Sequence, residues 1–164
     1  MSAQNPYDSF LDGRPLETIL TATHGVIASL LSTMPQDKWS APPAPGKWSL
    51  AEIICHLADC EIAFGFRLRQ TLAENGPTLE PFDQEKWAAT YGGVPATTAL
   101  DAFTALRKWN LRLIGSVMPA AADRPAFHPE RGPLTFQTIV ETMAGHDLNH
   151  LAQLRKIANP DPPA

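Results

Sequence analysis

The positions of proline constrain the fold of this chain more than any other feature. Its 16 prolines gather mainly at 35–45, 77–95 and 119–133, and long proline-free segments separate these clusters. A proline inside a helix removes a hydrogen bond and clashes with the preceding turn. The clusters therefore mark connections, and the segments between them are free to form long helices.

Apolar residues in the proline-free segments recur with the 3.6-residue period of an amphipathic helix. The first helix is expected over about 15–33. The second is expected to begin after Ser49, which forms a capping-box pattern with Glu52. It runs for roughly 25 residues, too long for a strand, and stops at Asn75-Gly76.

Two further helices follow the same rules. We expect Thr98 to cap the third helix, with Asp101 at the box position, and Pro119 to end it. We expect Thr135 to cap the fourth helix and Asn159-Pro160 to stop it. Four helices of similar length predict an all-α fold, a four-helix bundle.

The connections shape the expected topology. No segment shows a strand signal, and the chain length suggests one domain over 1–164. The two connections at 77–97 and 119–134 are long enough to cross over, so a simple up-down order is not required. The first of them contains a possible short helical turn at 82–87, and Asp83 and Trp87 are candidates to line a pocket mouth there.

Charge and hydropathy exclude several functional classes. The net charge is −4 without a basic cluster, so nothing points to nucleic acid or an anionic membrane as partner. No apolar run approaches the roughly 18 residues of a membrane span, and the start has no secretory signal pattern. We therefore expect a cytoplasmic protein, with Cys55 and Cys60 reduced.

Histidines in two helical segments suggest a metal site. His146 and His150 lie four residues apart within an apolar stripe, so both imidazoles face one side of a helix. The spacing resembles that of His-Glu-x-x-His metalloproteases, but position 147 is Asp and the general-base Glu is missing. His56 lies at the edge of the second helical stripe and is the candidate third ligand. Three neutral imidazoles suit zinc, nickel or ferrous iron and leave coordination positions open.

Polar neighbours of these histidines have weaker assignments. Asp59 is three residues after His56 and either orients that imidazole or is simply an exposed helical residue. Cys60 could approach the metal, although a small core residue is the simpler interpretation. His128 could cap the site, but it is interpreted as a residue that structures its loop unless a fourth metal ligand is found. Glu61 has three candidate ion-pair partners: Arg67, Arg69 and Arg107.

Five motifs along most of the chain together match one known family. They are Pro-Gly-Lys-Trp-Ser at 45–49, His-Leu-Ala-Asp-Cys-Glu at 56–61, Pro-Phe-Asp at 81–83, Phe-His-Pro-Glu-Arg-Gly at 127–132 and Ala-Gly-His-Asp-Leu-Asn-His-Leu-Ala-Gln at 144–153. With them the chain resembles the DinB-like (YfiT-type) metal-binding proteins. The resemblance implies an up-down-down-up four-helix bundle, usually dimeric, with a divalent metal on His56, His146 and His150.

The same resemblance implies a class of chemistry. Some relatives transfer or isomerise substrates with a low-molecular-weight thiol, and others are described as hydrolases. We therefore expect a metal-dependent enzyme acting on a small molecule, with thiol S-transfer as first choice and zinc or nickel as the metal. A hydrolase or a non-catalytic metal-binding stress-response protein is the alternative, and the sequence names no catalytic side chain.

Overall fold

The structure is a computed structural model and describes residues 5–159. Four long helices dominate it: α1 (Leu16–Thr33), α2 (Leu50–Ala73), α4 (Ala96–Val117) and α5 (Phe136–Ala158). The shorter elements are η1 (Asp8–Phe10), η2 (Gln36–Lys38), α3 (Gln84–Ala88), β1 (Pro125–His128) and β2 (Gly132–Thr135).

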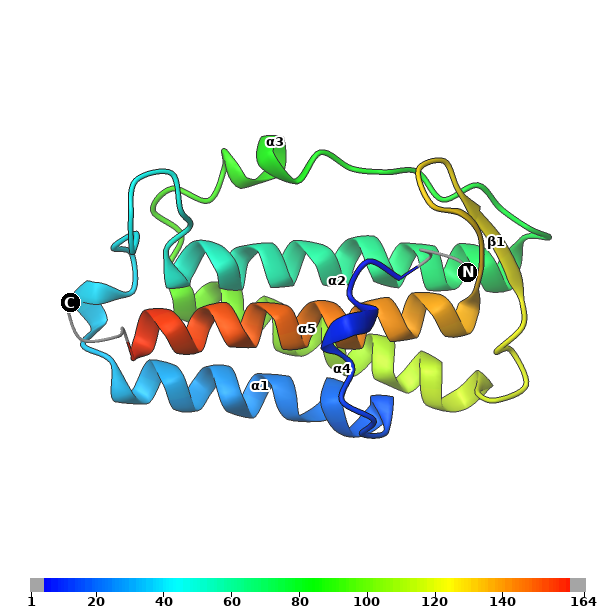
Figure 1. The fold of residues 1–164 in the computed structure, drawn as a ribbon, viewed down its shortest axis with the longest axis horizontal. Helices are drawn as coiled ribbons and strands as arrows, with labels where there is room; N and C mark the ends of the chain where they lie inside the picture. The colour runs from blue at the N-terminus through cyan, green and yellow to red at the C-terminus, as the bar shows by residue number, and fades with distance from the viewer. Residues whose placement is uncertain (1–4, 160–164) are drawn as a thin grey trace.

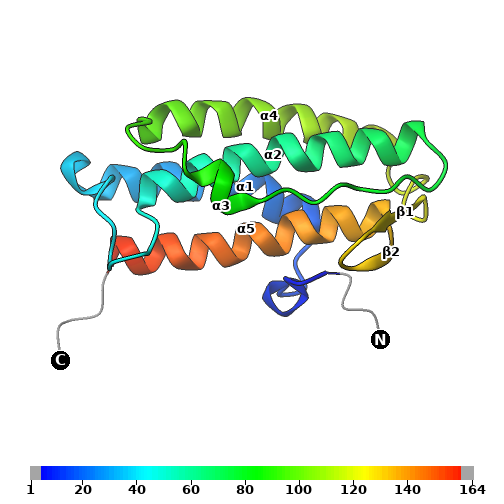
Figure 2. The same ribbon diagram turned by 90° about the horizontal axis from the view of Figure 1, so that it is seen from above.

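The four long helices form the predicted bundle, and their directions are up-down-down-up. Figure 1 shows α1 and α5 running in one direction and α2 and α4 in the other. Because α2 and α4 are parallel neighbours, the connection at 74–95 has to travel the length of the bundle, and Figures 1 and 2 show it doing so along one side with α3 in its path. The all-α, four-helix-bundle prediction is confirmed.

Helix starts follow the capping patterns at two of three predicted positions. The Ser49 hydroxyl accepts a bond from the Glu52 N–H, and the Glu52 carboxylate accepts one from the Ser49 N–H. Thr135 caps α5 through a reciprocal bond with Thr138. The predicted Thr98 cap was wrong, because α4 begins at Ala96, directly after Pro95. The fixed φ of proline suits a helix start without any side-chain cap.

At its other end, α5 stops at Ala158, with Asn159 as the C-cap residue. This agrees with the Asn159 half of the predicted stop signal. Pro160, the other half, lies outside the described residues.

A β-hairpin in the connection from α4 to α5 was missed by the sequence analysis. β1 and β2 pair antiparallel, with Phe127 opposite Pro133 and His128 opposite Gly132. Each strand has only four residues and includes a proline, so no alternating pattern could develop. Gly132 has φ +75°, which lets the chain reverse there. The hairpin thus gives His128 and its neighbours a fixed position at one end of the bundle.

A buried polar network divides the apolar core and joins all four long helices. Arg107 of α4 pairs with Glu61 of α2 at 2.8 Å and with Asp147 of α5 at 2.6 Å, and it donates to the Leu20 carbonyl of α1. Burial opposes a charged guanidinium, but the two carboxylates outweigh it and raise the pKa of Arg107. Of the three candidate partners for Glu61, Arg107 is therefore the one that pairs with it.

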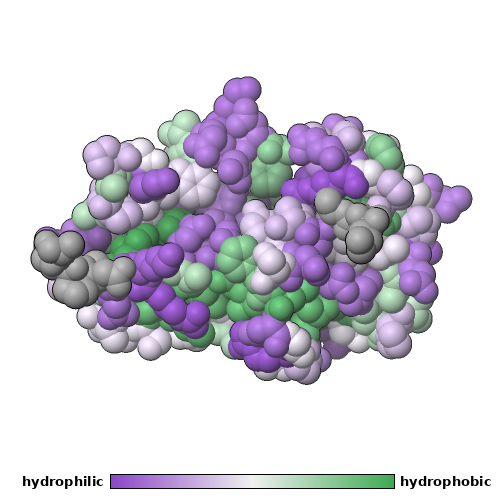
Figure 3. Space-filling view, in the orientation of Figure 1, coloured by the Kyte–Doolittle hydropathy of each residue, from purple (hydrophilic) through white to green (hydrophobic). Residues whose placement is uncertain are grey.

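The surface seen in Figure 3 carries hydrophobic side chains in the middle of the face and hydrophilic ones around them. None of the helices within residues 5–159 has the length and hydropathy needed to cross a membrane.

Candidate metal centre

Three histidines from two helices converge in the centre of the bundle. The Nε2 atom of His146 lies 3.1 Å from Nε2 of His56 and 3.1 Å from Nε2 of His150. All three residues are buried, and one ring nitrogen from each lies within 4.8 Å of the others. The structure therefore brings together the three residues that the sequence selected, although His56 and His146 are 90 residues apart along the chain.

The donor chemistry of this cluster fits a cation. A neutral imidazole carries a single N–H. The Nε2 atom of His146 therefore cannot donate a hydrogen bond to the Nε2 atoms of both His56 and His150. At least one lone pair then faces another nitrogen. One divalent cation would satisfy all three lone pairs together, and a buried polar group without a partner is costly.

Local contacts favour the metal-binding form of the rings. Burial and the nearby His150 lower the pKa of His56 to about 4, and burial also lowers the pKa of His146 and of His150. Neutral imidazole is the form that binds a metal. The Oε1 atom of Gln153 lies 3.1 Å from Nδ1 of His150, so the ring proton belongs on Nδ1 and the Nε2 lone pair is free.

The sulfur of Cys60 is a further potential metal-ligand atom close to the three histidines. Its sulfur lies 3.5 Å from Nε2 of His56 and 3.7 Å from Nε2 of His146. Burial, reinforced by the charge of Glu61, raises the pKa of the Cys60 thiol above its usual value. Without a metal the side chain is therefore a neutral thiol in the wall of the site, as the small-core-residue interpretation expects.

The N-terminal arm closes one side of the histidine cluster. The ring of Tyr7 stands edge-on to the His146 ring, with centroids 5.1 Å apart. This contact depends on Gly145, because a Cβ atom at that position would lie 2.6 Å from the Tyr7 carbonyl oxygen. Figure 1 shows the arm, with η1 in dark blue, crossing α5. The arm was expected to be irregular and was given no role at the site.

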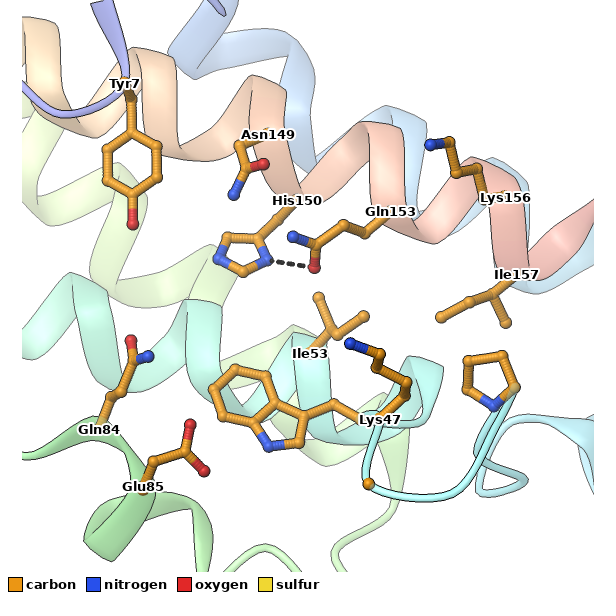
Figure 4. Close-up of a pocket in the computed structure, with 13 residues that line it drawn as sticks. Tyr7, Lys47, Ile53, Gln84, Glu85, Asn149, His150, Gln153, Lys156 and Ile157 are labelled. Atoms are coloured by element: carbon orange, nitrogen blue, oxygen red, sulfur yellow. Dashed lines mark hydrogen bonds between the residues drawn. The ribbon is translucent and has the colours of Figure 1, made fainter.

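Two cavities reach the histidines from different sides. The larger has a volume of about 660 Å³, includes His150 in its wall and lies between α5, the 43–48 segment and the start of α3. Figure 4 shows His150 and Gln153 on one side of it and Gln84 and Glu85 on the other. The smaller, of about 230 Å³, has His56 and His146 in its wall. Among residues 5–159, Tyr7 and Gln84 alone line both cavities, so they stand at the boundary between them.

Comparison with known families agrees with this architecture. The family model of the DinB superfamily matches residues 19–154, which include all three histidines and all four long helices apart from their outermost turns. The chain belongs to the DinB superfamily. The resemblance inferred from the five motifs is confirmed.

Relatives of this DinB-superfamily chain carry names that refer to metal-dependent hydrolysis. A protein of Oceanobacillus iheyensis named "Putative metal-dependent hydrolase" is 29% identical over 113 residues, which cover 68% of this chain and 66% of that protein. One of Bacillus mycoides with the same name is 24% identical over 132 residues, covering 80% and 76%.

A solved structure shares the fold. It is YfiT from Bacillus subtilis, described as "a probable metal-dependent hydrolase with an unusual four-helix bundle topology". The TM-score is 0.80 at 18% sequence identity, over 87% of this chain and 83% of that one. At this identity the likeness shows the fold of the DinB-superfamily chain.

The other polar residues selected from the sequence have different positions. Asp59 accepts a hydrogen bond from the Tyr91 hydroxyl at 2.8 Å, and among residues 5–159 it makes none with His56. Asp83 caps α3 and pairs with Lys86, while Trp87 packs on Phe82. Neither Asp83 nor Trp87 lines either cavity; Gln84 does.

His128 was correctly interpreted as structuring its loop. It is buried, and its Nδ1 accepts a bond from the Glu130 N–H at 3.2 Å. It also lines the smaller cavity together with Arg67 and Arg131, whose place there the sequence analysis missed. The motif at 127–132 marked this segment, but only the hairpin shows which way it faces.

Proposed function

We propose that this DinB-superfamily protein is a metal-dependent S-transferase that joins the sulfur of a small thiol to an electrophilic carbon of a second substrate. The thiol loses its proton, the new carbon–sulfur bond replaces the bond from that carbon to a leaving group, and the leaving group departs with the bonding electron pair, as chloride does from a chloroarene. The observation that carries the proposal is the meeting of two cavities of unequal size at one histidine cluster. A transferase has two organic reactants to place beside one centre. Hydrolysis needs a place for one organic reactant and a water molecule.

The three histidines are the proposed ligands, and zinc or nickel is the proposed metal. A divalent ion on three imidazoles supplies Lewis acidity, which favours the deprotonated form of a thiol or of water. The ligand set suits both metals, because imidazole is a good donor for each. Gln153 fixes the orientation of His150, as described above.

The thiol in this proposal comes from outside the chain. Burial, with Asp59 and Glu52 nearby, raises the pKa of the Cys55 thiol to about 11, and burial also raises that of Cys60. Thiols act as nucleophiles in the thiolate form, so neither cysteine is a ready internal nucleophile at neutral pH. A small external thiol entering one of the cavities is the more reactive candidate.

The two carboxylates nearest the histidines along the chain, Asp147 and Asp59, give little support to water activation. Asp147, next to His146, is held by Arg107 and by the Thr23 hydroxyl. Asp59 is held by Tyr91. A hydrolase of the His-Glu-x-x-His type needs a free carboxylate beside the metal as general base. The names of the relatives keep hydrolysis as the second candidate.

Tyr7 has the position of a hydrogen-bond donor in this mechanism. It lines both cavities, and burial is the main cause that raises the pKa of its phenol. The hydroxyl therefore keeps its proton at neutral pH. It can donate a hydrogen bond to negative charge that develops on the substrate, which is the general role of such donors in catalysis.

Metal content tests the ligand assignment first. Protein purified without a histidine tag should contain about one divalent metal ion per chain by elemental analysis. His56→Ala, His146→Ala and His150→Ala should each lose most of it. His24→Ala is the matched control, because His24 is exposed on α1 and lines neither cavity. Undiminished metal in His146→Ala or His150→Ala would contradict the assignment.

Turnover tests the reaction. The metal-loaded protein is incubated with an electrophile such as 1-chloro-2,4-dinitrobenzene and with each of several small thiols in turn. Metal-dependent conjugation that disappears in His56→Ala supports the transferase. Product that forms without any thiol favours the hydrolase. If the metal-bound protein turns over none of a broad panel of thiols and electrophiles, the result would instead favour a non-catalytic metal-binding protein.

A further inference from the structure

Arg67 is a buried cation without a carboxylate partner. Its residue is only 8% exposed, in the second half of α2. One guanidinium nitrogen donates to the Glu80 carbonyl at 2.7 Å, and the group lies 5.8 Å from the centre of the Phe82 ring. Among residues 5–159 no acidic side chain forms an ion pair with it. Buried charges in proteins are normally paired, so this one calls for a ligand.

A second guanidinium faces the same cavity. Arg131 lies in the turn of the β-hairpin, where its N–H donates to the His128 carbonyl at 3.1 Å. It lines the smaller cavity together with Arg67, and the two charges are close enough for Arg131 to add to burial in lowering the pKa of Arg67. Two like charges on one small cavity repel each other unless an anion lies between them.

The remaining groups of the cavity agree with an anionic ligand. His128 accepts a bond at Nδ1 from the Glu130 N–H, so its neutral ring carries the proton on Nε2, a further donor. Among residues 5–159, Glu130 is the one acidic residue that lines the cavity, and it is exposed while Arg67 is buried. Two arginines against one glutamate leave the lining with an excess of positive charge.

We propose that Arg67 and Arg131 form a subsite for a carboxylate group of one of the two reactants, beside His56 and His146. Guanidinium groups bind carboxylates through paired N–H···O bonds, which single ammonium groups cannot match. The volume of about 230 Å³ suits a small carboxylate-bearing ligand. The inference rests on the proposed function for the identity of the reactants, which are a thiol and an electrophile.

The carboxylate could belong to either reactant, and paired probes distinguish the two sources. The thiol pair is 3-mercaptopropionate and its neutral methyl ester. The electrophile pair is 4-chloro-3-nitrobenzoate and its methyl ester. Dissociation constants are measured by titration calorimetry on the metal-containing protein as isolated, with metal content determined for every variant. The two members of each pair differ in one negative charge, so the ratio of their dissociation constants measures the contribution of that charge to binding.

In the wild-type protein, the acid of at least one pair should bind tenfold or more tightly than its ester. This preference should fall to less than threefold in Arg67→Gln and in Arg131→Gln, while Arg67→Lys retains part of it. Arg112→Gln is the matched control, because it removes an exposed positive charge of α4 that lines neither cavity. Should Arg67→Gln fail to fold, Arg131→Gln still decides, since that side chain is only half-buried and makes no ion pair within residues 5–159.

Two results would overturn the subsite. One is equal affinity for acid and ester in both pairs. The other is a preference for the acid that survives both arginine substitutions, since the metal or another group would then bind the carboxylate. Failure of the proposed function looks different, because the preference would persist with full metal content while no thiol transfer occurs. Failure of the subsite alone would leave transfer active with acids and esters alike.

Discussion

Replacing Arg107 by Met, which keeps an unbranched, flexible stem but removes the guanidinium, should destabilise the bundle severely. Arg107 is 3% exposed and makes four hydrogen bonds, to both oxygens of Asp147, to Glu61 and to the Leu20 carbonyl. Its loss leaves two carboxylates, both buried, with only neutral donors. Thr23 remains for Asp147, and Asn110 remains for Glu61.

The expected cost is that of an uncompensated buried charge. Removing one partner of a buried ion pair costs about 3–5 kcal/mol, against a total stability of about 5–15 kcal/mol for a typical domain. For a chain of this size such a loss lowers the melting temperature by roughly 6–20 °C. Thr23→Val is the matched control, because it removes one neutral hydroxyl from the same carboxylate and leaves Arg107 in place, so it should cost less, about 1.5–3 kcal/mol.

Urea unfolding followed by circular dichroism measures both variants, at fixed metal concentration because a bound metal stabilises the folded state. A double-mutant cycle with Asp147→Asn completes the test. The double variant should lose less than the sum of the two single losses, since the charge that Arg107 compensates is then gone. A cost below about 1 kcal/mol for Arg107→Met, or simple additivity in the cycle, would refute the reasoning.

Three further predictions concern assembly, acidity and the arm. Light scattering should give about twice the 17.9 kDa chain mass, as the family resemblance implies for a homodimer, and a monomer at high concentration would contradict this. Burial, with Arg131 and Arg67 nearby, lowers the pKa of His128; the unfolded chain therefore binds a proton that the folded protein does not, and stability falls as the pH drops below about 6.5. Between neutral and mildly acidic pH, the free energy of unfolding should fall less in His128→Gln than in the wild type, as measured by denaturation at both pH values. Gly145→Ala should displace the arm from α5, because the added Cβ atom meets the Tyr7 carbonyl, and protease cleavage within the arm should become at least severalfold faster, whereas Gly25→Ala has open space around it and should change nothing.

The fold was predictable because proline and hydrophobic periodicity act locally. Each long helix is fixed by its own segment, so the absence of proline and the apolar stripe were sufficient to place α1, α2 and α5 within a few residues. The start of α4 was misplaced because Thr98 looks like a good cap, whereas Pro95 begins the helix through its backbone geometry. The hairpin was missed because its two strands are too short for an alternating pattern, and its contacts with the distant 77–79 segment leave no local signal in the sequence.

The histidines were predictable for the same reason, and their surroundings were not. The spacing of His146 and His150 alone shows that they share a helix face. His56 was a candidate from the edge of the second helical stripe, and the family resemblance added it to the set. Tyr7 lies far from them in the sequence and reaches them only because Gly145 admits the arm. Arg67 looked like an ion-pair partner for Glu61, a role that Arg107 takes, and only the packed structure shows that Arg67 is left beside a cavity.

The wide separation of the three histidines also sets an order of events during biosynthesis. At about 5–20 residues per second, a ribosome adds His146 roughly 5–18 s after His56. A nascent chain therefore carries only His56 of the three ligand candidates until α5 is made. The complete three-nitrogen set comes into being only with α5 packed against α2. Metal binding by all three imidazoles would then be a late step. It would stabilise complete chains, whereas a chain truncated before α5 lacks two of the three histidines and would gain no such stability.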